Sequence, residues 1–218
     1  MINSQNVLNV YNQHAKLYDK MMNQLKYAKT LKNLVESLPI NIPSGGKILE
    51  LGCGTGIATG ILIKKFPNSE IIGFDYSDEM LKICHERYPN LKLVRGNFNE
   101  KEDFDSFITT LDDKIVSFPD SSFDFIFSTG AVSEYGQLEK VIPIIYNLIK
   151  RDSQFINIGI KRNLIGLIMG RCWNFDPPGE NKFIEECKKA GFSDTTLIPL
   201  NWRLFPTSHV KYAVNAVK

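Results

Sequence analysis

The chain lacks an excess of charge of either sign. Its 26 basic and 24 acidic residues leave a formal net charge of +2 over 218 residues. A strong electrostatic field toward a nucleic acid backbone or an anionic membrane surface is therefore not implied. We expect no nucleic acid among the partners of this protein.

Cysteine and histidine are too few and too scattered to indicate a metal centre. The four cysteines, at positions 53, 84, 172 and 187, show no pair spacing typical of zinc ligands, and neither do the three histidines, at positions 14, 85 and 209. The cysteines also lack the density of a small secreted framework. We expect reduced thiols in an intracellular protein, and no bound metal.

Long apolar runs are absent as well. Uncharged, mainly apolar stretches such as Val141 to Ile149 are far too short to span a bilayer. The opening residues also lack a basic flank followed by an apolar core. We therefore expect a cytoplasmic protein with no membrane insertion. With 43% hydrophobic residues, the chain can bury one substantial core, which predicts a single domain over residues 1–218.

A glycine-rich stretch at 46–56 organises the rest of the chain. Residues 47–51 form a short apolar strand, glycines follow at positions 52, 54 and 56, and a helical pattern begins at Ile57. Such a turn lets the backbone approach a ligand and aims helix N–H groups at it. The spacing differs from the dinucleotide pattern G-x-G-x-x-G, and the carboxylate of Glu50 favours a cationic group over a pyrophosphate.

Strands and helices alternate along most of the chain. Strands are predicted at 47–51, 70–75, 91–95, 123–128, 154–160, 194–199 and 208–217, and helices at 56–65, 78–88, 138–150 and 180–190. This alternation predicts an α/β fold with a doubly wound, mostly parallel, seven-stranded sheet and a ligand at the carboxyl ends of its strands. Ahead of this α/β core at 41–218, residues 1–40 are expected to form one or two amphipathic helices.

Two motifs together resemble those of class I S-adenosylmethionine-dependent methyltransferases. Glu50-Leu-Gly-Cys-Gly-Thr-Gly56 is similar to the nucleotide-binding motif of that family, and 75–81 is similar to its D-x-S-x-x-M-L stretch. The resemblance implies a Rossmann-like fold with an antiparallel C-terminal hairpin, S-adenosyl-L-methionine as cofactor, and methyl transfer to a small molecule. It also implies that Gly52, Gly54 and Gly56 admit the methionine half and that Glu50 supports the glycine loop and the ammonium group.

The same resemblance assigns the adenosine half of the cofactor. Asp75, followed by Tyr76, would hold the ribose hydroxyls. Relatives usually carry Gly-Asp after the third strand, whereas this chain has Asn97, whose amide oxygen can still accept a hydrogen bond from the adenine amino group. Phe98 would pack on the adenine ring. Residues 10–19 resemble a helix that covers the cofactor in quinone-methylating relatives, which places Tyr18 in a lid over the cofactor or, alternatively, in an anchor on the core.

Two loops are expected to face the acceptor. The first follows the fourth strand and contains Glu134 and Tyr135, and the second, at 161–178, is long and apolar and contains Met169 and Trp173. These aromatic and apolar residues predict a small, partly aromatic or apolar acceptor, although the second loop has the alternative of covering the sheet edge. If the nucleophile requires deprotonation, Glu134 and His14 are the candidate general bases, with an exposed or helix-capping Glu134 as the alternative.

An acidic insertion at 99–116 is predicted to be a solvated helix with Phe107 and Ile108 packed inward. Two other functions stay open at this point. A nicotinamide-dependent oxidoreductase would use a related sheet but a different glycine spacing, and a non-catalytic binding protein would keep the cofactor site without a productive acceptor pocket.

Overall fold

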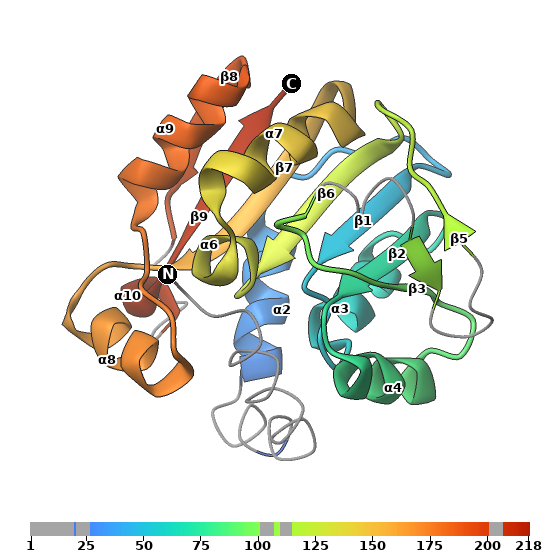
Figure 1. The fold of residues 1–218 in the computed structure, drawn as a ribbon, viewed down its shortest axis with the longest axis horizontal. Coiled ribbons are helices and arrows are strands. Elements are labelled where there is room, and N and C mark those ends of the chain that lie inside the picture. The colour runs from blue at the N-terminus through green and yellow to red at the C-terminus, as the bar shows by residue number, and fades with distance from the viewer. Residues whose placement is uncertain (1–19, 21–26, 101–106, 110–114, 201–206) are drawn as a thin grey trace.

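The computed structural model describes residues 20, 27–100, 107–109, 115–200 and 207–218. The helices are α2 (Tyr27–Ser37), α3 (Ile57–Lys65), α4 (Asp78–Arg87), α6 (Val132–Tyr135), α7 (Leu138–Leu148), α8 (Leu164–Trp173), α9 (Glu180–Ala190) and α10 (Thr207–Val210) (Figure 1). The strands are β1 (Lys47–Leu51), β2 (Glu70–Asp75), β3 (Lys92–Arg95), β4 (Phe107–Thr109), β5 (Ile115–Val116), β6 (Phe123–Thr129), β7 (Ile149–Ile160), β8 (Asp194–Ile198) and β9 (Lys211–Val217).

All strands of the described residues join one sheet, in the order β5-β4-β3-β2-β1-β6-β7-β9-β8. The five strands from β3 to β7 in this order are parallel. At the end of the chain, β9 pairs antiparallel with both β7 and β8, so the predicted C-terminal hairpin is confirmed. The chain winds outward in one direction from β1 to β3 and in the other from β6 onward. The glycine loop after β1 therefore lies at the point where the winding direction changes.

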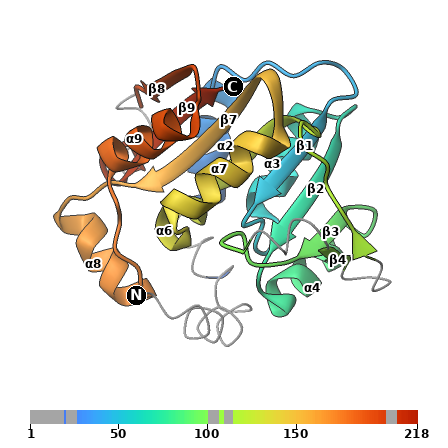
Figure 2. The same ribbon diagram turned by 45° about the horizontal axis from the view of Figure 1, so that its top comes forward.

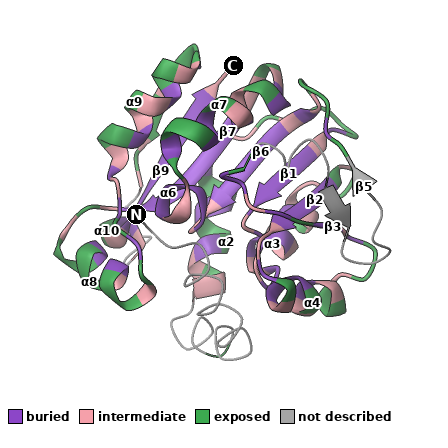
Figure 3. Cartoon of the chain, viewed as in Figure 1, coloured by how far each residue is buried: buried purple, intermediate pink, exposed green. Residues whose placement is uncertain are grey.

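Helices cover both faces of the sheet. One buried cluster joins Leu49, Phe74 and Phe155 of the strands to α6, α7 and α9, and a second joins Ile48, Phe125 and their same-face neighbours to α2, α3 and α4 (Figure 2). Successive strand residues point to opposite faces, so central strands enclosed between two helical layers are apolar throughout. Figure 3 shows this as an almost continuous band of buried residues along the middle strands.

The expected N-terminal helices are only partly within the described residues. Residues 27–37 of this region form α2, whose Leu31 and Leu34 are buried as the amphipathic pattern predicted, and Leu38, just after the helix, is buried as well. Residues 1–19, which include His14 and Tyr18, lie outside the described part of the chain. The roles predicted for these two side chains therefore stay predictions.

The acidic insertion differs from its prediction. Its described residues 107–109 and 115–116 form β4 and β5, which add an antiparallel pair to the edge of β3 and raise the strand number from seven to nine. Edge strands present unpaired backbone N–H and C=O groups, and the Phe-Ile-Thr sequence of β4 has the aromatic and β-branched residues that suit a strand. Pairing with the edge therefore prevailed over the helical pattern.

Three element boundaries also differ from expectation. The loop predicted at 161–178 contains α8, which Asn163 caps by accepting a hydrogen bond from the N–H of Gly166 at 2.9 Å. Strand β7 begins at Ile149, five positions before the predicted 154, because Ile149 pairs with Phe123. Strand β9 begins at Lys211 rather than 208, after the short helix α10.

Candidate functional site

The glycine loop has backbone dihedral angles that residues other than glycine rarely adopt. Gly52, Gly54 and Gly56 have φ angles of 76°, 54° and 87°. At Gly52 a Cβ atom would lie 2.1 Å from the Cβ of Ala131, whereas at Gly54 it would meet no atom within 4 Å. Gly52 is therefore required by contact with the loop after β6, and Gly54 presents open backbone on which a ligand can lie.

Asp75 closes the glycine loop from the end of the neighbouring strand. One carboxylate oxygen accepts a hydrogen bond from the Gly54 N–H at 2.8 Å, and the other accepts one from the Ser77 N–H at 2.9 Å. Enclosure raises the pKa of Asp75, and these backbone donors oppose that rise. Asp75 was expected from the sequence to hold the ribose, but its direct hydrogen bond to the glycine loop was not expected, because Gly54 and Asp75 are 21 positions apart.

Glu50 lies beneath the loop and is only 1% exposed. Its Oε2 accepts a hydrogen bond from the Thr59 hydroxyl at 2.6 Å, while no donor of the described residues contacts Oε1. Burial is the main reason that the pKa of this carboxyl rises to about 8. A buried carboxylate oxygen without a partner, under a loop with open backbone, fits a cationic group such as an amino acid ammonium, reached directly or through water.

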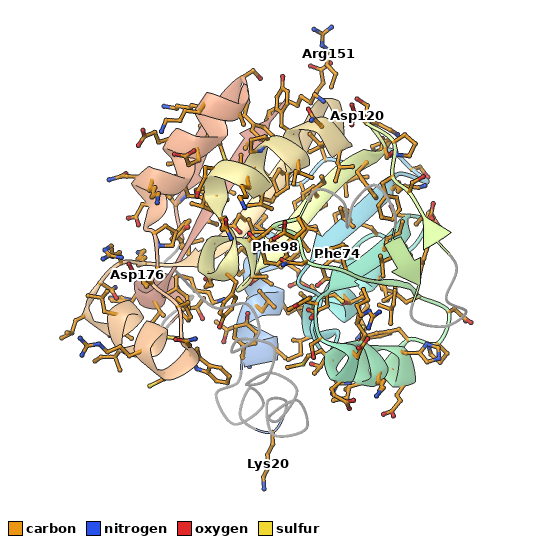
Figure 4. The ribbon with its side chains drawn as sticks, in the orientation of Figure 1. Lys20, Phe74, Phe98, Asp120, Arg151 and Asp176 are labelled. Carbon is orange, nitrogen blue, oxygen red and sulfur yellow. The ribbon has the colours of Figure 1, made fainter. Side chains whose placement is uncertain are left out.

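The adenosine-side residues are placed less favourably than the glycine loop. Asn97 follows β3, and its Oδ1 accepts a hydrogen bond from the Asn99 N–H at 3.1 Å, so an adenine amino group would share this oxygen. Phe98 belongs to the same buried cluster as Phe74 (Figure 4). It is only 8% exposed, which argues against the predicted broad contact with the adenine ring. Tyr76 is partly exposed beside Asp75.

The loop after β6 turns Glu134 inward. The hydroxyl of Ser128 accepts a hydrogen bond from the Val132 N–H at 3.2 Å, which starts the short helix α6. Glu134 is 3% exposed, its Oε1 accepts from the Ile160 N–H at 2.9 Å, and its Oε2 accepts from the Ser133 hydroxyl at 2.7 Å. Both oxygens therefore stabilise the junction of α6 and β7. This geometry argues against the predicted general-base role, and also against an exposed Glu134.

The two loops expected at the acceptor side do meet. The Tyr135 hydroxyl donates a hydrogen bond to the Trp173 carbonyl oxygen at 3.0 Å, and the rings of Tyr135 and Phe175 pack edge to face with centroids 5.6 Å apart. Met169 lies one turn before Trp173 on α8, so both are on one side of this helix. The predicted acceptor residues Tyr135, Met169 and Trp173 thus come from connected elements, although their contact with an acceptor stays a prediction.

Helix α8 itself presents an apolar surface. It projects at the lower left of Figure 1, and four of its large hydrophobic residues are exposed, with Leu164 at 75%. The other three are Ile165, Leu167 and Ile168. Sequence analysis assigned these residues to a loop that faces an acceptor or covers the sheet edge, and the helix leaves them largely uncovered by described residues.

One polar cluster at the carboxyl end of β6 was not predicted from the sequence. The ammonium group of Lys211 lies 3.1 Å from the Tyr27 hydroxyl and 3.4 Å from the Thr129 hydroxyl, although Lys211 is only 7% exposed. The three residues belong to β9, α2 and β6, so they are far apart in sequence. A lysine at the start of an apolar strand was the one available signal.

The described residues contain no cluster of metal ligands and no candidate membrane span, and they form a groove away from the glycine loop. No group of three or more potential metal ligands occurs in the described ranges, and no helix found there has the length and apolar composition to cross a membrane. A groove of about 580 Å³ is lined by residues including Phe66, Glu70, Tyr88 and Lys92. Because Glu70 and Lys92 begin their strands, this groove lies at the opposite end of the sheet from the glycine loop.

Known proteins resemble this chain in sequence and in fold. Residues 42–189 match the family model described as a methyltransferase domain. A malonyl-[acyl-carrier protein] O-methyltransferase from Ilyobacter polytropus is 27% identical over 178 residues, which cover 72% of this chain and 64% of the relative. A trans-aconitate 2-methyltransferase from Rhodopseudomonas palustris is 36% identical over 66 residues, which cover 30% of this chain and 25% of that protein.

These two curated relatives are thus matched over about a quarter to two thirds of their own length. Among solved structures, an S-adenosylmethionine-dependent methyltransferase from Archaeoglobus fulgidus superposes with a TM-score of 0.68 at 17% identity, covering 92% of this chain and 99% of that one. The structural likeness supports the fold, and the family model spans more than half of the chain and includes the glycine loop. The chain therefore belongs to the class I S-adenosylmethionine-dependent methyltransferase family.

Proposed function

We propose that this protein transfers a methyl group from S-adenosylmethionine to a small, partly apolar or aromatic molecule. The observation that carries the proposal is the glycine loop, whose open backbone at Gly54 lies between the buried Glu50 and the carboxylate of Asp75. Such a site suits a ligand that has an amino acid end and a ribose and no phosphate. The family to which the chain belongs uses a cofactor of that kind.

Different residues of the chain would bind different parts of the cofactor. Gly52, Gly54 and Gly56 would admit the methionine half, Glu50 would receive its ammonium group, and Asp75 would accept hydrogen bonds from the ribose. Bound there, the cofactor supplies a methyl group already activated by a sulfonium. The protein then has to align an acceptor atom in line with that methyl group and to exclude water.

The acceptor side is supported by the contact between α6 and α8. Tyr135, Met169 and Trp173 would form one wall for an apolar or aromatic acceptor, close to the loop at Ala131 that contacts Gly52. Two relatives carry the names of trans-aconitate and malonyl-acyl-carrier-protein methyltransferases, so these compounds belong in an acceptor panel.

We also propose a cytoplasmic protein, formed as one domain over 1–218 with a helical lid at 1–40, that acts without nucleic acid. The support is the balanced net charge of +2 and the single sheet of the described residues. Salt-dependent binding of this protein to duplex or single-stranded DNA or RNA at micromolar concentration would contradict the proposal.

Methyl transfer is tested with radiolabelled S-adenosylmethionine and a panel of small acceptors. Transfer of label to at least one acceptor is expected. Cofactor binding without turnover on any acceptor would instead favour the non-catalytic binding protein. A thermal shift with a nicotinamide cofactor and none with S-adenosylmethionine would favour the oxidoreductase.

Replacing Asp75 by alanine is expected to weaken S-adenosylmethionine binding by about 1.5 to 3 kcal/mol, the scale of a hydrogen bond to a charged group. Calorimetry measures this difference. Asp120→Ala is a matched control, because Asp120 is exposed and far from the loop (Figure 4). Equal cofactor affinity in the native protein and Asp75→Ala would remove Asp75 from the site.

A further inference from the structure

Lys211 is a buried cation whose nearest partners among the described residues are neutral. Its ammonium group lies 3.1 Å from the hydroxyl oxygen of Tyr27, 5.0 Å from the centre of the Tyr27 ring, and 3.4 Å from the hydroxyl oxygen of Thr129. An ammonium group has three N–H donors. Two donors are directed at these hydroxyl groups, so the third has no acceptor among the described residues.

Within the described part of the chain, the charge on Lys211 is compensated at a distance. Glu134 is close enough for the Lys211 charge to lower the pKa of its carboxyl, against the larger rise caused by burial. However, the Glu134 oxygens accept hydrogen bonds from Ile160 and Ser133, and no ion pair within 4.0 Å joins Lys211 to a carboxylate of the described residues. An enclosed ammonium without a direct anionic partner is costly. It is therefore suited to receive an anion.

This ammonium contacts the end of β6, the strand that pairs with β1 and so lies next to the glycine loop. Thr129 is the last residue of β6, Gly130 follows with open space around it, and the next residue, Ala131, packs on Gly52. Thr129 and Tyr27 are both partly exposed, whereas Lys211 is buried behind them. The polar atoms therefore converge where the carboxyl end of β6 meets the proposed cofactor site.

We propose that Lys211, with the Tyr27 and Thr129 hydroxyl groups, binds a carboxylate of the acceptor and that this carboxylate is the group that is methylated. The inference rests on the proposed function and names its substrate class. One carboxylate oxygen accepts a hydrogen bond from the Lys211 ammonium, and the other faces the methyl group.

The chemistry of a carboxylate acceptor agrees with the absence of a free base at Glu134. A carboxylate is already ionised at neutral pH. Its oxygen forms a bond to the methyl carbon while the carbon–sulfur bond breaks, and the electron pair of that bond stays on sulfur, which becomes a neutral thioether. The product is a methyl ester, and no proton is transferred. The buried Glu134 therefore has no proton to remove.

The test compares acids with their amides. The native protein is assayed with labelled S-adenosylmethionine against trans-aconitate and a series of apolar and aromatic carboxylic acids, each paired with its primary amide, and products are identified by mass spectrometry. Methyl esters of acids are expected, with no product from the amides. Methylation of amides or amines in preference to acids would overturn the inference and leave the proposed function intact, whereas failure to bind S-adenosylmethionine would count against the proposed function itself.

Variants then assign the effect to Lys211. Lys211→Met is expected to raise the KM for the acid at least tenfold with unchanged cofactor affinity. Lys211→Arg keeps the charge, so its KM should lie between those of the native protein and Lys211→Met. Lys188→Met is the matched control, because Lys188 is exposed in the last turn of α9, outside the cluster. An unchanged KM in Lys211→Met would overturn the inference.

A further variant covers the case in which Lys211→Met does not fold. Tyr27→Phe keeps the ring beside Lys211 and removes only the hydroxyl group. It is expected to raise the KM for the acid about threefold or more while circular dichroism stays native. If no acid is turned over, calorimetry with the same acids on protein saturated with S-adenosylhomocysteine decides, and an absence of binding by every acid contradicts the inference.

Discussion

Replacing Glu50 by glutamine is expected to remove about 5 kcal/mol of the fall in stability of the free protein between pH 5 and pH 9. The unfolded carboxyl ionises near 4.5 and the folded one near 8. Between these values the folded state holds a proton that the unfolded state has released, so the free energy of unfolding falls as pH rises. At about 1.4 kcal/mol per pKa unit, the total loss is about 5 kcal/mol. Glutamine has no ionisable proton, so the Glu50→Gln protein does not suffer this loss of stability.

Urea unfolding of both proteins across this pH range measures the difference. The stability of Glu50→Gln relative to the native protein should rise by several kcal/mol from pH 5 to pH 9. Glu70→Gln is the control, because Glu70 is exposed at the start of β2 and its removal should change stability by less than about 0.5 kcal/mol. Parallel pH profiles for the native protein and Glu50→Gln would show that Glu50 ionises normally in the fold.

The Glu50→Gln substitution should weaken cofactor binding, although it stabilises the free protein at high pH. A bound ammonium group favours the ionised carboxylate, so S-adenosylmethionine binding near pH 7 is expected to release a proton from Glu50. Calorimetry in buffers of different ionisation enthalpy detects this release, which Glu50→Gln should abolish. These opposite effects on binding and stability separate a ligand-binding carboxylate from one that only supports the fold.

The core of the fold was predictable because its signals are local. The run 47–56 contains strand, turn and helix start within ten residues, and the glycines and the apolar strand leave few other conformations. Each central strand is enclosed on both faces, so its apolar run is continuous and easily recognised. The sheet order then follows from short right-handed connections. The two motifs of the family resemblance added the cofactor class.

The misplaced elements depend on contacts between distant residues. Strands β4 and β5 form because the edge of β3 is open to pairing, which the sequence of 99–116 does not reveal. Helix α8 has an apolar composition that resembles a pocket wall, yet Gly166 and Gly170 are the residues it buries, while Leu164 and Ile168 are exposed. Composition alone did not distinguish a buried face from an uncovered one.

The acceptor side was the least predictable part of the site. Glu134 follows a strand in the position where a catalytic base would be sought, and only the three-dimensional structure shows that its oxygens accept from Ile160 and Ser133. Lys211 is 77 positions further along the chain and reaches the same region by antiparallel pairing of β9 with β7. A side chain's chemical role here is decided by which strand ends become neighbours.

Replacing Glu134 by alanine is therefore expected to destabilise the protein by about 1 to 3 kcal/mol, the scale of leaving a buried hydrogen-bond partner unsatisfied. The substitution leaves the Ile160 N–H without its acceptor and Lys211 without its nearest compensating charge. Glu134→Gln should cost less, because its amide oxygen can still accept from Ile160. Thermal and urea unfolding measure these losses.

The control for this prediction is Glu139→Ala, because Glu139 is exposed in the first turn of α7 and its loss should change stability by less than about 0.5 kcal/mol. Turnover measured per folded molecule separates a structural carboxylate from a catalytic one. If Glu134 only supports the junction of α6 and β7, Glu134→Gln retains most of its turnover wherever it is folded. A fall of about 100-fold or more at native stability, the scale of losing a general base, would instead return Glu134 to the chemistry and require its side chain to leave the buried position.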